Sequence, residues 1–171
     1  MKMKYIAFLS AALSLAACSS SGGGKSPSLP ETEAVWMRFG TGEYELKLTS
    51  FAGACDLEQQ GTSHKADSRY AAFHFTLPSG SDDVAAGDYP FGPTGNVADM
   101  TLKTLDSSCN TAVSVEASGG KITLSDAMTT NGGDVHGSYS ITMADGSVVS
   151  GTFAAASCPL PSTPTSGTCV Q

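Results

Sequence analysis

The chain has 171 residues, 40% of them hydrophobic and 15% charged, and its formal net charge at pH 7 is −7. That length is enough for one domain with a sizeable core. The acidic balance argues against a nucleic-acid partner, because nucleic-acid binding needs a basic surface.

The first residues have the layout of an export signal. Lys2 and Lys4 precede an apolar stretch over residues 5–15, which is too short to span a bilayer comfortably. The stretch ends in Leu15-Ala16-Ala17-Cys18, which resembles the lipobox of bacterial lipoproteins. The resemblance implies cleavage after residue 17, a diacylglyceryl thioether on Cys18 and a further acyl chain, such as palmitate, on the new N-terminus.

The lipid anchor predicts where the protein is located. Each buried methylene of an acyl chain contributes about 0.8 kcal/mol, so two or more chains anchor a protein stably. By analogy with lipoprotein sorting in Gram-negative bacteria, Ser19 after the cysteine suggests the outer membrane, on either its periplasmic or its external side. The alternative is a soluble secreted protein in which Cys18 has no special role.

The composition divides the chain into four segments. We expect a signal peptide over 1–17, a lipidated cysteine with a flexible Ser/Gly/Pro-rich tether over 18–33, a β domain over 34–158 and a Pro/Ser/Thr-rich tail over 159–171.

Four cysteines remain once Cys18 is set apart, and an even number in an exported chain predicts two disulfides. Three pairings are possible. We favour Cys55–Cys109 and Cys158–Cys169, because the second bridge would close a short proline-rich loop and hold the tail. No spacing resembles the Cys-x-x-Cys of metal sites, so we expect no metal there.

Alternation of apolar and polar residues predicts strands over 43–51 and 69–77. Tyr44, Leu46 and Leu48 share one face of the first strand, with Glu45, Lys47 and Thr49 on the other. Phe73, Phe75 and Leu77 face inward in the second, with His74 outward. Further strands are expected at 35–39, 87–89, 100–105, 111–117, 121–127, 134–143 and 147–155.

No helical period of useful length is present, so we expect an all-β fold. Eight or nine short strands indicate an antiparallel β-sandwich or a partly closed barrel, stabilised by the disulfides. Trp36, the only tryptophan, lies inside a predicted strand and is expected in the core.

Two turns are predicted in the C-terminal half. A two-residue turn at Gly119-Gly120 would pair Ala117 with Ile122 and Val115 with Leu124. A three-residue loop over 144–146, with Gly146 in a bulge, would place Ile141 opposite Val149 and Tyr139 opposite Gly151. The tyrosine ring would then cover the bare glycine backbone.

The end of the domain carries a second resemblance. The run from Gly137 to Met143, then Asp145-Gly146, the run from Gly151 to Phe153 and Cys158 resemble a pattern in uncharacterised lipoproteins of Gram-negative bacteria. These residues are structural, so the resemblance implies a β fold and supplies no active site.

The chain contains no recognisable catalytic motif. His64, His74 and His136 lack the spacing of a zinc site, and Gly-x-Ser-x-Gly is absent from the sequence. We therefore expect no enzyme and no cofactor. An enzyme would instead require two groups from His64, His136 and the acidic loops to meet in one cleft.

Two loop features are candidate binding sites. Asp82, Asp83 and Asp88 could hold calcium, although a solvated turn is the favoured interpretation. Tyr89 and Phe91 lie in a proline-containing loop and could stack on sugar rings. The favoured alternative is an apolar plug over the open end of the fold.

These observations predict a lipid-anchored envelope protein with a non-enzymatic structural or binding role toward an envelope protein or glycan. The alternatives are a carbohydrate- or calcium-binding module and, less favoured, an enzyme with its residues on loops.

Overall fold

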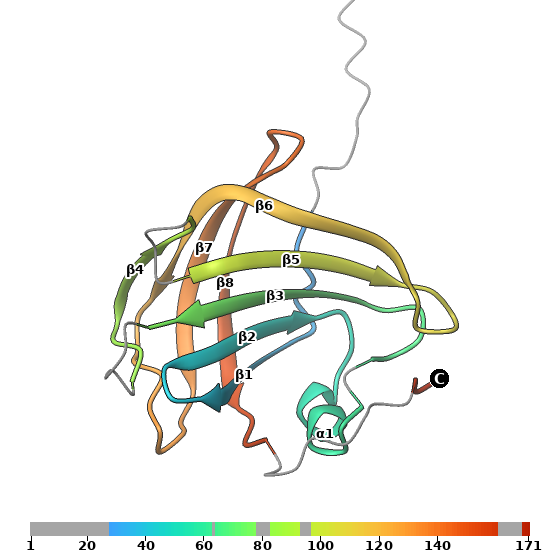
Figure 1. Ribbon diagram of the computed structural model, residues 1–171, viewed down its shortest axis with the longest axis horizontal. Coiled ribbons are helices and arrows are strands. Elements are labelled where there is room, and N and C mark those ends of the chain that lie inside the picture. The colour runs from blue at the N-terminus through green and yellow to red at the C-terminus, as the bar shows by residue number, and fades with distance from the viewer. Residues whose placement is uncertain (1–27, 63, 78–82, 93–96, 161–168) are drawn as a thin grey trace, which may run out of the picture.

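The computed structural model describes residues 28–62, 64–77, 83–92, 97–160 and 169–171. The predicted signal peptide, Cys18 and most of the tether lie outside these residues. The elements are β1 (Glu33–Gly40), β2 (Glu43–Thr49), α1 (Ala54–Gln59), β3 (Arg69–Thr76), β4 (Gly87–Pro90), β5 (Val97–Leu105), β6 (Thr111–Leu124), β7 (Val135–Met143) and β8 (Val148–Ser157) (Figure 1).

The strands form one sheet in the order β4-β6-β5-β3-β2-β1-β8-β7. An additional β6–β7 pairing closes seven of them into a barrel, and β4 lies beside the second half of β6. Neighbouring strands are antiparallel except β1 and β8, which run parallel and share only two residue pairs, Val35–Ala156 and Trp36–Ser157. The prediction of an all-β fold is confirmed.

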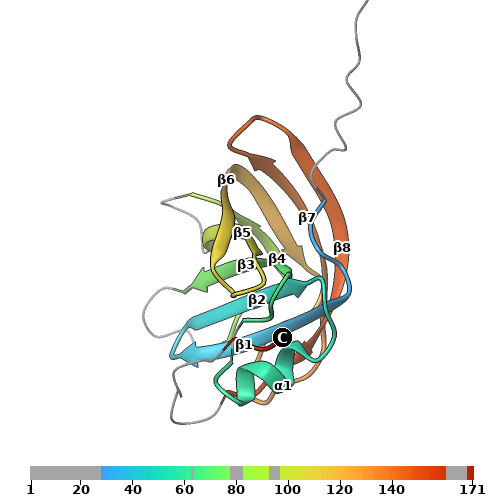
Figure 2. The same cartoon turned by 90° about the vertical axis from the view of Figure 1, so that its right-hand side faces the viewer.

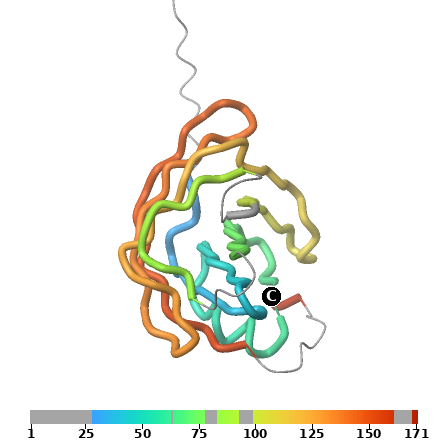
Figure 3. Tube along the Cα trace, turned by 60° about the vertical axis from the view of Figure 1, so that its left-hand side comes forward, coloured from blue at the N-terminus to red at the C-terminus, as the bar shows by residue number. Residues whose placement is uncertain are grey.

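Strand β6 corrects the prediction of a turn at Gly119-Gly120. It is one continuous strand that pairs with β5 through its first half and with β7 through its second. The register shifts between Ala117 and Gly119, and Gly120 has a φ of 113°. A positive φ serves a bulge as well as a reversal, so the strand continues through these glycines from β5 to β7; Figures 1 and 3 show the bend in β6.

The β7–β8 hairpin has the predicted register. Ile141 pairs with Val149 and Tyr139 with Gly151, and Gly146 takes a φ of 83° in the loop. The Tyr139 ring lies over Gly151, where any added Cβ would overlap it. The phenyl ring of Phe153 covers Gly137 on the partner strand in the same way.

Gly137→Ala is expected to lower the free energy of unfolding by about 3 kcal/mol, because the new methyl group would overlap the Thr123 carbonyl and the Phe153 ring. Gly119→Ala is the matched control: nothing lies within 4 Å of a Cβ there, so its effect should stay within about 0.5 kcal/mol. Urea unfolding of both variants measures the difference, and equal stabilities would contradict the close packing at Gly137.

The barrel interior is filled by side chains from every strand. Tyr44, Leu46, Phe73 and Phe75 are at most 1% exposed, as their alternation predicts. Trp36 is also buried, and its indole Nε1 donates a hydrogen bond of 2.7 Å to the Gly133 carbonyl.

Helix α1 covers part of the outer face of the sheet. It lies between the strands predicted over 43–51 and 69–77, and its six residues are too few to show a helical period. Ala54 packs with Val35, Met37 and Cys158 in a second apolar cluster outside the barrel, and Figure 2 shows the helix beneath β1. No helix in the described part of the chain combines the length and apolar character needed to cross a membrane.

The four cysteines form two disulfides, as predicted, but the predicted pairing is wrong. Cys55 of α1 bonds to Cys158 after β8, and Cys109 of the β5–β6 loop bonds to Cys169. The reason is the sheet order. β1 lies next to the end of β8, so Cys158 meets the helix that covers β1. Residues 64–66 and Val170 pair near the β5–β6 loop, and this brings Cys169 to Cys109.

Candidate functional site

A cleft of about 330 Å³ opens on the outer face of β2, β3 and β5. The strand registers explain its shape. Ala72 and Thr101 are cross-strand partners and provide small side chains at its centre. The larger partners His74 and Asp99 lie two residues away on one side, and Tyr70 and Lys103 two residues away on the other. The floor of the cleft is thus formed by small side chains, and larger side chains form its walls on two sides. Lys47 and Glu58 also line it.

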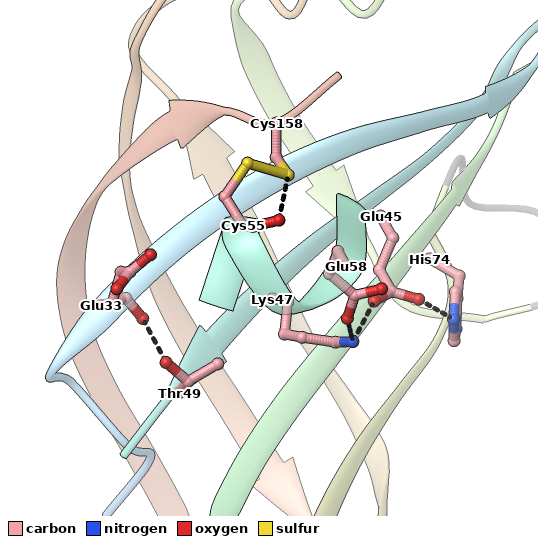
Figure 4. Close-up of polar contacts among 8 residues, drawn as sticks. All are labelled: Glu33, Glu45, Lys47, Thr49, Cys55, Glu58, His74 and Cys158. Carbon is pink, nitrogen blue, oxygen red and sulfur yellow. Dashed lines mark hydrogen bonds and ion pairs between the residues drawn. A yellow bond between two sulfur atoms is a disulfide. The ribbon is translucent and has the colours of Figure 1, made fainter. Parts of the chain in front are cut away.

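A buried charge network borders the cleft. The Lys47 ammonium forms an ion pair with Glu58 of α1, and its Nζ lies 3.4 Å from Oε1 of Glu45. The three side chains are between 8% and 11% exposed. The same ammonium lies 5.1 Å from the centroid of the Tyr70 ring. Figure 4 shows Lys47 between the two glutamates, with His74 on the far side of Glu45.

Pairing keeps these buried groups charged. Burial by itself would raise the pKa of Glu45, but the hydrogen bond from His74 and the charge of Lys47 outweigh it and hold that pKa below its ordinary value. Burial would likewise lower the pKa of Lys47, and the charges of Glu45 and Glu58 raise it instead. Removing one member would leave a buried charge without its counter-ion.

His74 joins two carboxylates across three strands. Its Nε2 lies 2.8 Å from Oε2 of Glu45, and its Nδ1 lies 2.5 Å from Oδ1 of Asp99. The hydrogen bond to Glu45 is the main reason that its pKa rises to about 9, against the opposing effect of burial. At neutral pH the ring is therefore an imidazolium that donates to both acids.

On the opposite side of the cleft, around Tyr70, the basic side chain is not paired with an acid among the described residues. The Lys103 ammonium lies 6.0 Å from the centroid of the Tyr70 ring, and no acidic side chain in the described part of the chain forms an ion pair with it. The His64 ring is 6.3 Å from the Tyr70 ring, centroid to centroid. Burial, followed by the charge of Lys47, lowers the pKa of His64 below its ordinary value.

The two aromatics considered as a sugar-binding site pack against the core, as the favoured interpretation of an apolar plug predicts. Tyr89 is 7% exposed, its hydroxyl donates a 2.5 Å hydrogen bond to the Ala85 carbonyl, and its ring packs edge-on against Phe75. Phe91 is partly buried against Phe73. This placement differs from the exposed stacking surface that ligand binding by these rings would require, because both rings pack against phenylalanines of β3.

The acidic residues weighed as a calcium site do not converge. Asp82 lies outside the described residues. Asp83 accepts a hydrogen bond from the Thr130 amide, and Asp88 instead binds Lys121 and Thr123. Across the described segments, no group of three or more His, Cys, Asp or Glu side chains is arranged to hold a metal ion.

Two of the three histidines line the cleft, and His136 lies elsewhere. His64 lines the cleft, whereas His136 lies on β7 with its Nδ1 2.7 Å from Asp126. The cleft therefore combines His64 and His74 with residues that sequence reasoning did not select, chiefly Phe39, Glu58, Tyr70 and Lys103. Alternation marked Glu45, Lys47 and His74 as outward-facing, but it carried no signal that a helix places Glu58 against Lys47.

Comparisons of the chain with models of protein families, with curated proteins and with solved structures found no match in any of the three. Fold and site together define an all-β domain with a charged, partly covered cleft on the outside of its barrel.

The network predicts a pH-dependent stability. The raised pKa of His74 contributes stability that is fully present below pH 6.5 and is lost as the pH rises toward 9. The lowered pKa of Glu45 contributes stability that is present above pH 4.5 and is lost as the pH falls below that value. Urea unfolding from pH 6 to 9.5 should show a decline of about 1 kcal/mol, a small value because solvent screens a half-exposed side chain.

His74→Gln should remove this alkaline decline, because glutamine does not titrate. His136→Gln, which changes a histidine outside the cleft, should retain it. A decline that persists in His74→Gln would show that another group causes it.

Proposed function

We propose that the protein is a lipid-anchored, non-enzymatic module of the outer membrane that binds an envelope component through the cleft. The lipobox-like run ending in Cys18 supports the anchor, and the Ser/Gly/Pro-rich residues that follow would let the domain reach its partner. The acidic overall charge supports a lipid anchor over a basic membrane-binding face.

One observation carries the binding role: ionised side chains are buried beside an open cleft, held by one another in fixed positions. Desolvating Glu45, Lys47 and Glu58 is costly, and an apolar cluster of the same volume would often be as stable. Groups fixed in advance lose little freedom when a ligand binds. Glu45, Lys47 and Glu58 lie at the edge of the cleft with their charges already fixed in place, and a binding site requires such preorganised groups.

The pKa shifts favour binding over proton transfer. An efficient general acid or base has a pKa near the working pH. Here the pKa of Glu45 is lowered, that of Lys47 is raised and that of His74 is raised to about 9. Each shift takes the group away from neutral pH and fixes its charge, so the network is suited to holding a ligand by constant charges.

The anchor is tested by Cys18→Ala. The full chain should move from the membrane fraction to the soluble fraction, because without the cysteine no diacylglyceryl group is attached. Immunoblotting of fractionated cells measures this, with Cys109→Ala as the matched cysteine control. Membrane retention of Cys18→Ala would contradict the anchor.

The cleft is tested by photo-crosslinking in intact cells. A benzoylphenylalanine at position 101, in the centre of the cleft, should form an adduct with an envelope component. The same residue at position 148, where Val148 is 60% exposed and lies outside the cleft, should not. The absence of any adduct at position 101, or equal adducts at both positions, would contradict a binding role for the cleft.

A further inference from the structure

Phe39 is the exposed aromatic residue of the cleft. Phe39 is 55% exposed, although Met37, two residues earlier on the same outer face of β1, is buried. The β1–β2 register shifts between Arg38 and Gly40, so Phe39 lies at a bulge. Bulges are over-represented beside functional sites. Phe39 keeps the outward direction of Met37 and exposes a large apolar ring at the edge of a polar cleft.

The cleft continues past Phe39 as a longer track. A second hollow of about 250 Å³ adjoins it, and both hollows are lined by Phe39, Glu45 and His74. Along β3 the lining extends from Tyr70 to Thr76, a distance of about 20 Å at the rise of a strand. This track, defined by the residues that line the two hollows, suits an extended ligand.

Two common kinds of occupant do not fit the track. A peptide that adds a strand needs an unpaired sheet edge, but β2 and β3 each have a neighbouring strand on both sides. An amphipathic helix needs an apolar groove. Of the large hydrophobic side chains that are exposed in the described residues, only Phe39 lines the track; Val113 and Val148 do not.

A sugar chain has the complementary chemistry. Its hydroxyl groups both donate and accept hydrogen bonds. The track provides acceptors on Glu43 and Glu58 and a donor on Lys103. The C–H face of a sugar ring can pack on an exposed aromatic face, while the rest of the sugar stays hydrated. Ligand sites commonly combine an apolar surface with a few placed polar groups in this way.

We propose that the track binds an oligosaccharide, with one sugar ring stacked on Phe39 and with the polar groups beside it binding hydroxyl groups. This inference rests on the binding role proposed above and assigns it a ligand class. It assigns sugar recognition to Phe39 on the outer face of the sheet. Tyr89 and Phe91, the candidates from the sequence, pack against the core instead.

The test is a glycan microarray probed with the full chain in detergent, carrying neutral, N-acetylated and uronic-acid-containing oligosaccharides. Any probe bound is then titrated by calorimetry. Phe39→Ala should weaken binding at least tenfold, Phe39→Tyr should keep it within threefold because the ring remains, and Val148→Ala should leave it unchanged. Thermal unfolding should be the same for all three, because both positions are exposed.

Two results would overturn the proposal: no oligosaccharide binds the wild-type chain, or one binds Phe39→Ala as tightly as the wild type. The crosslink from position 101 is read separately. An adduct there with a protein, together with an array that shows no binding, would leave the binding role standing and reject the sugar. The absence of an adduct would reject the binding role itself.

Discussion

Replacing Cys55 and Cys158 together by alanine should lower the free energy of unfolding by about 4 to 5 kcal/mol. The bridge joins residues 103 positions apart, and closing a loop of that length restricts the unfolded chain by about this amount. Urea unfolding under non-reducing conditions measures the loss. Peptide mapping of the wild-type protein under the same conditions should recover the Cys55–Cys158 and Cys109–Cys169 linkages.

The second bridge provides the matched control. Cys109→Ala/Cys169→Ala removes a link of 60 positions, for which the same chain-entropy argument gives a loss of about 4 kcal/mol. The two variants should differ at the cleft. Only the loss of Cys55–Cys158 releases α1, which carries Glu58 to Lys47. Lys47→Met should therefore destabilise the first variant less than the second, because Glu58 no longer lies against the ammonium once α1 is released; an equal cost in both would contradict the role of this bridge in holding α1.

Lys47→Met should cost about 3 to 5 kcal/mol at neutral pH, because it leaves Glu45 and Glu58 without the ammonium between them. Methionine keeps most of the lysine stem, so the loss reports the charge. The deficit should shrink as the pH falls below 4.5, since the carboxylate of Glu45 can then be protonated.

Lys121→Met is the control for the buried lysine. Lys121 forms an ion pair with Asp88 in which both side chains are more than half exposed, and such pairs contribute little. Its loss should change the free energy of unfolding by less than about 0.5 kcal/mol. Adding Glu45→Gln and Glu58→Gln to Lys47→Met should recover part of the stability. If Lys47→Met were as mild as the control, the network would not be the buried unit described above.

The outer-face network also explains why a small helix matters in a nearly all-β protein. α1 packs its Ala54 on β1, is tied to the end of β8 by a disulfide and places Glu58 against Lys47. It covers one side of the outer face, and the cleft lies beside it with Glu58 in its lining. The depth of the site therefore depends on the disulfide as well as on the sheet.

Much of the sheet could be predicted from the residues alone. Alternation in residues 43–49 and 69–76 correctly separated inward from outward side chains, because a strand turns successive residues to opposite faces. The register of the β7–β8 hairpin was also predictable, since a one-residue slip would have turned Val149 out of the core. The even number of cysteines predicted two bridges.

Other features depended on contacts between segments far apart in the chain. A glycine pair supports a turn or a bulge equally well, and at Gly119-Gly120 the partner strands β5 and β7 decided for a bulge. The cysteine pairing followed the sheet order, which no local pattern encodes. Aromatics near prolines could be exposed or buried, and Tyr89 is buried because its ring packs against Phe75 of β3.

The residue pattern was thus enough to predict most of the strands, their faces and the number of bridges, because these follow from the local period of the chain and from cysteine chemistry. The tertiary structure alone decided how the sheet closes, which cysteines meet and where the cleft lies. Glu45, Lys47 and Thr49 were predicted on the outward polar face, and they lie on that face yet are buried. The reason is that burial depends on what covers a face, and the covering contacts join residues up to 103 positions apart.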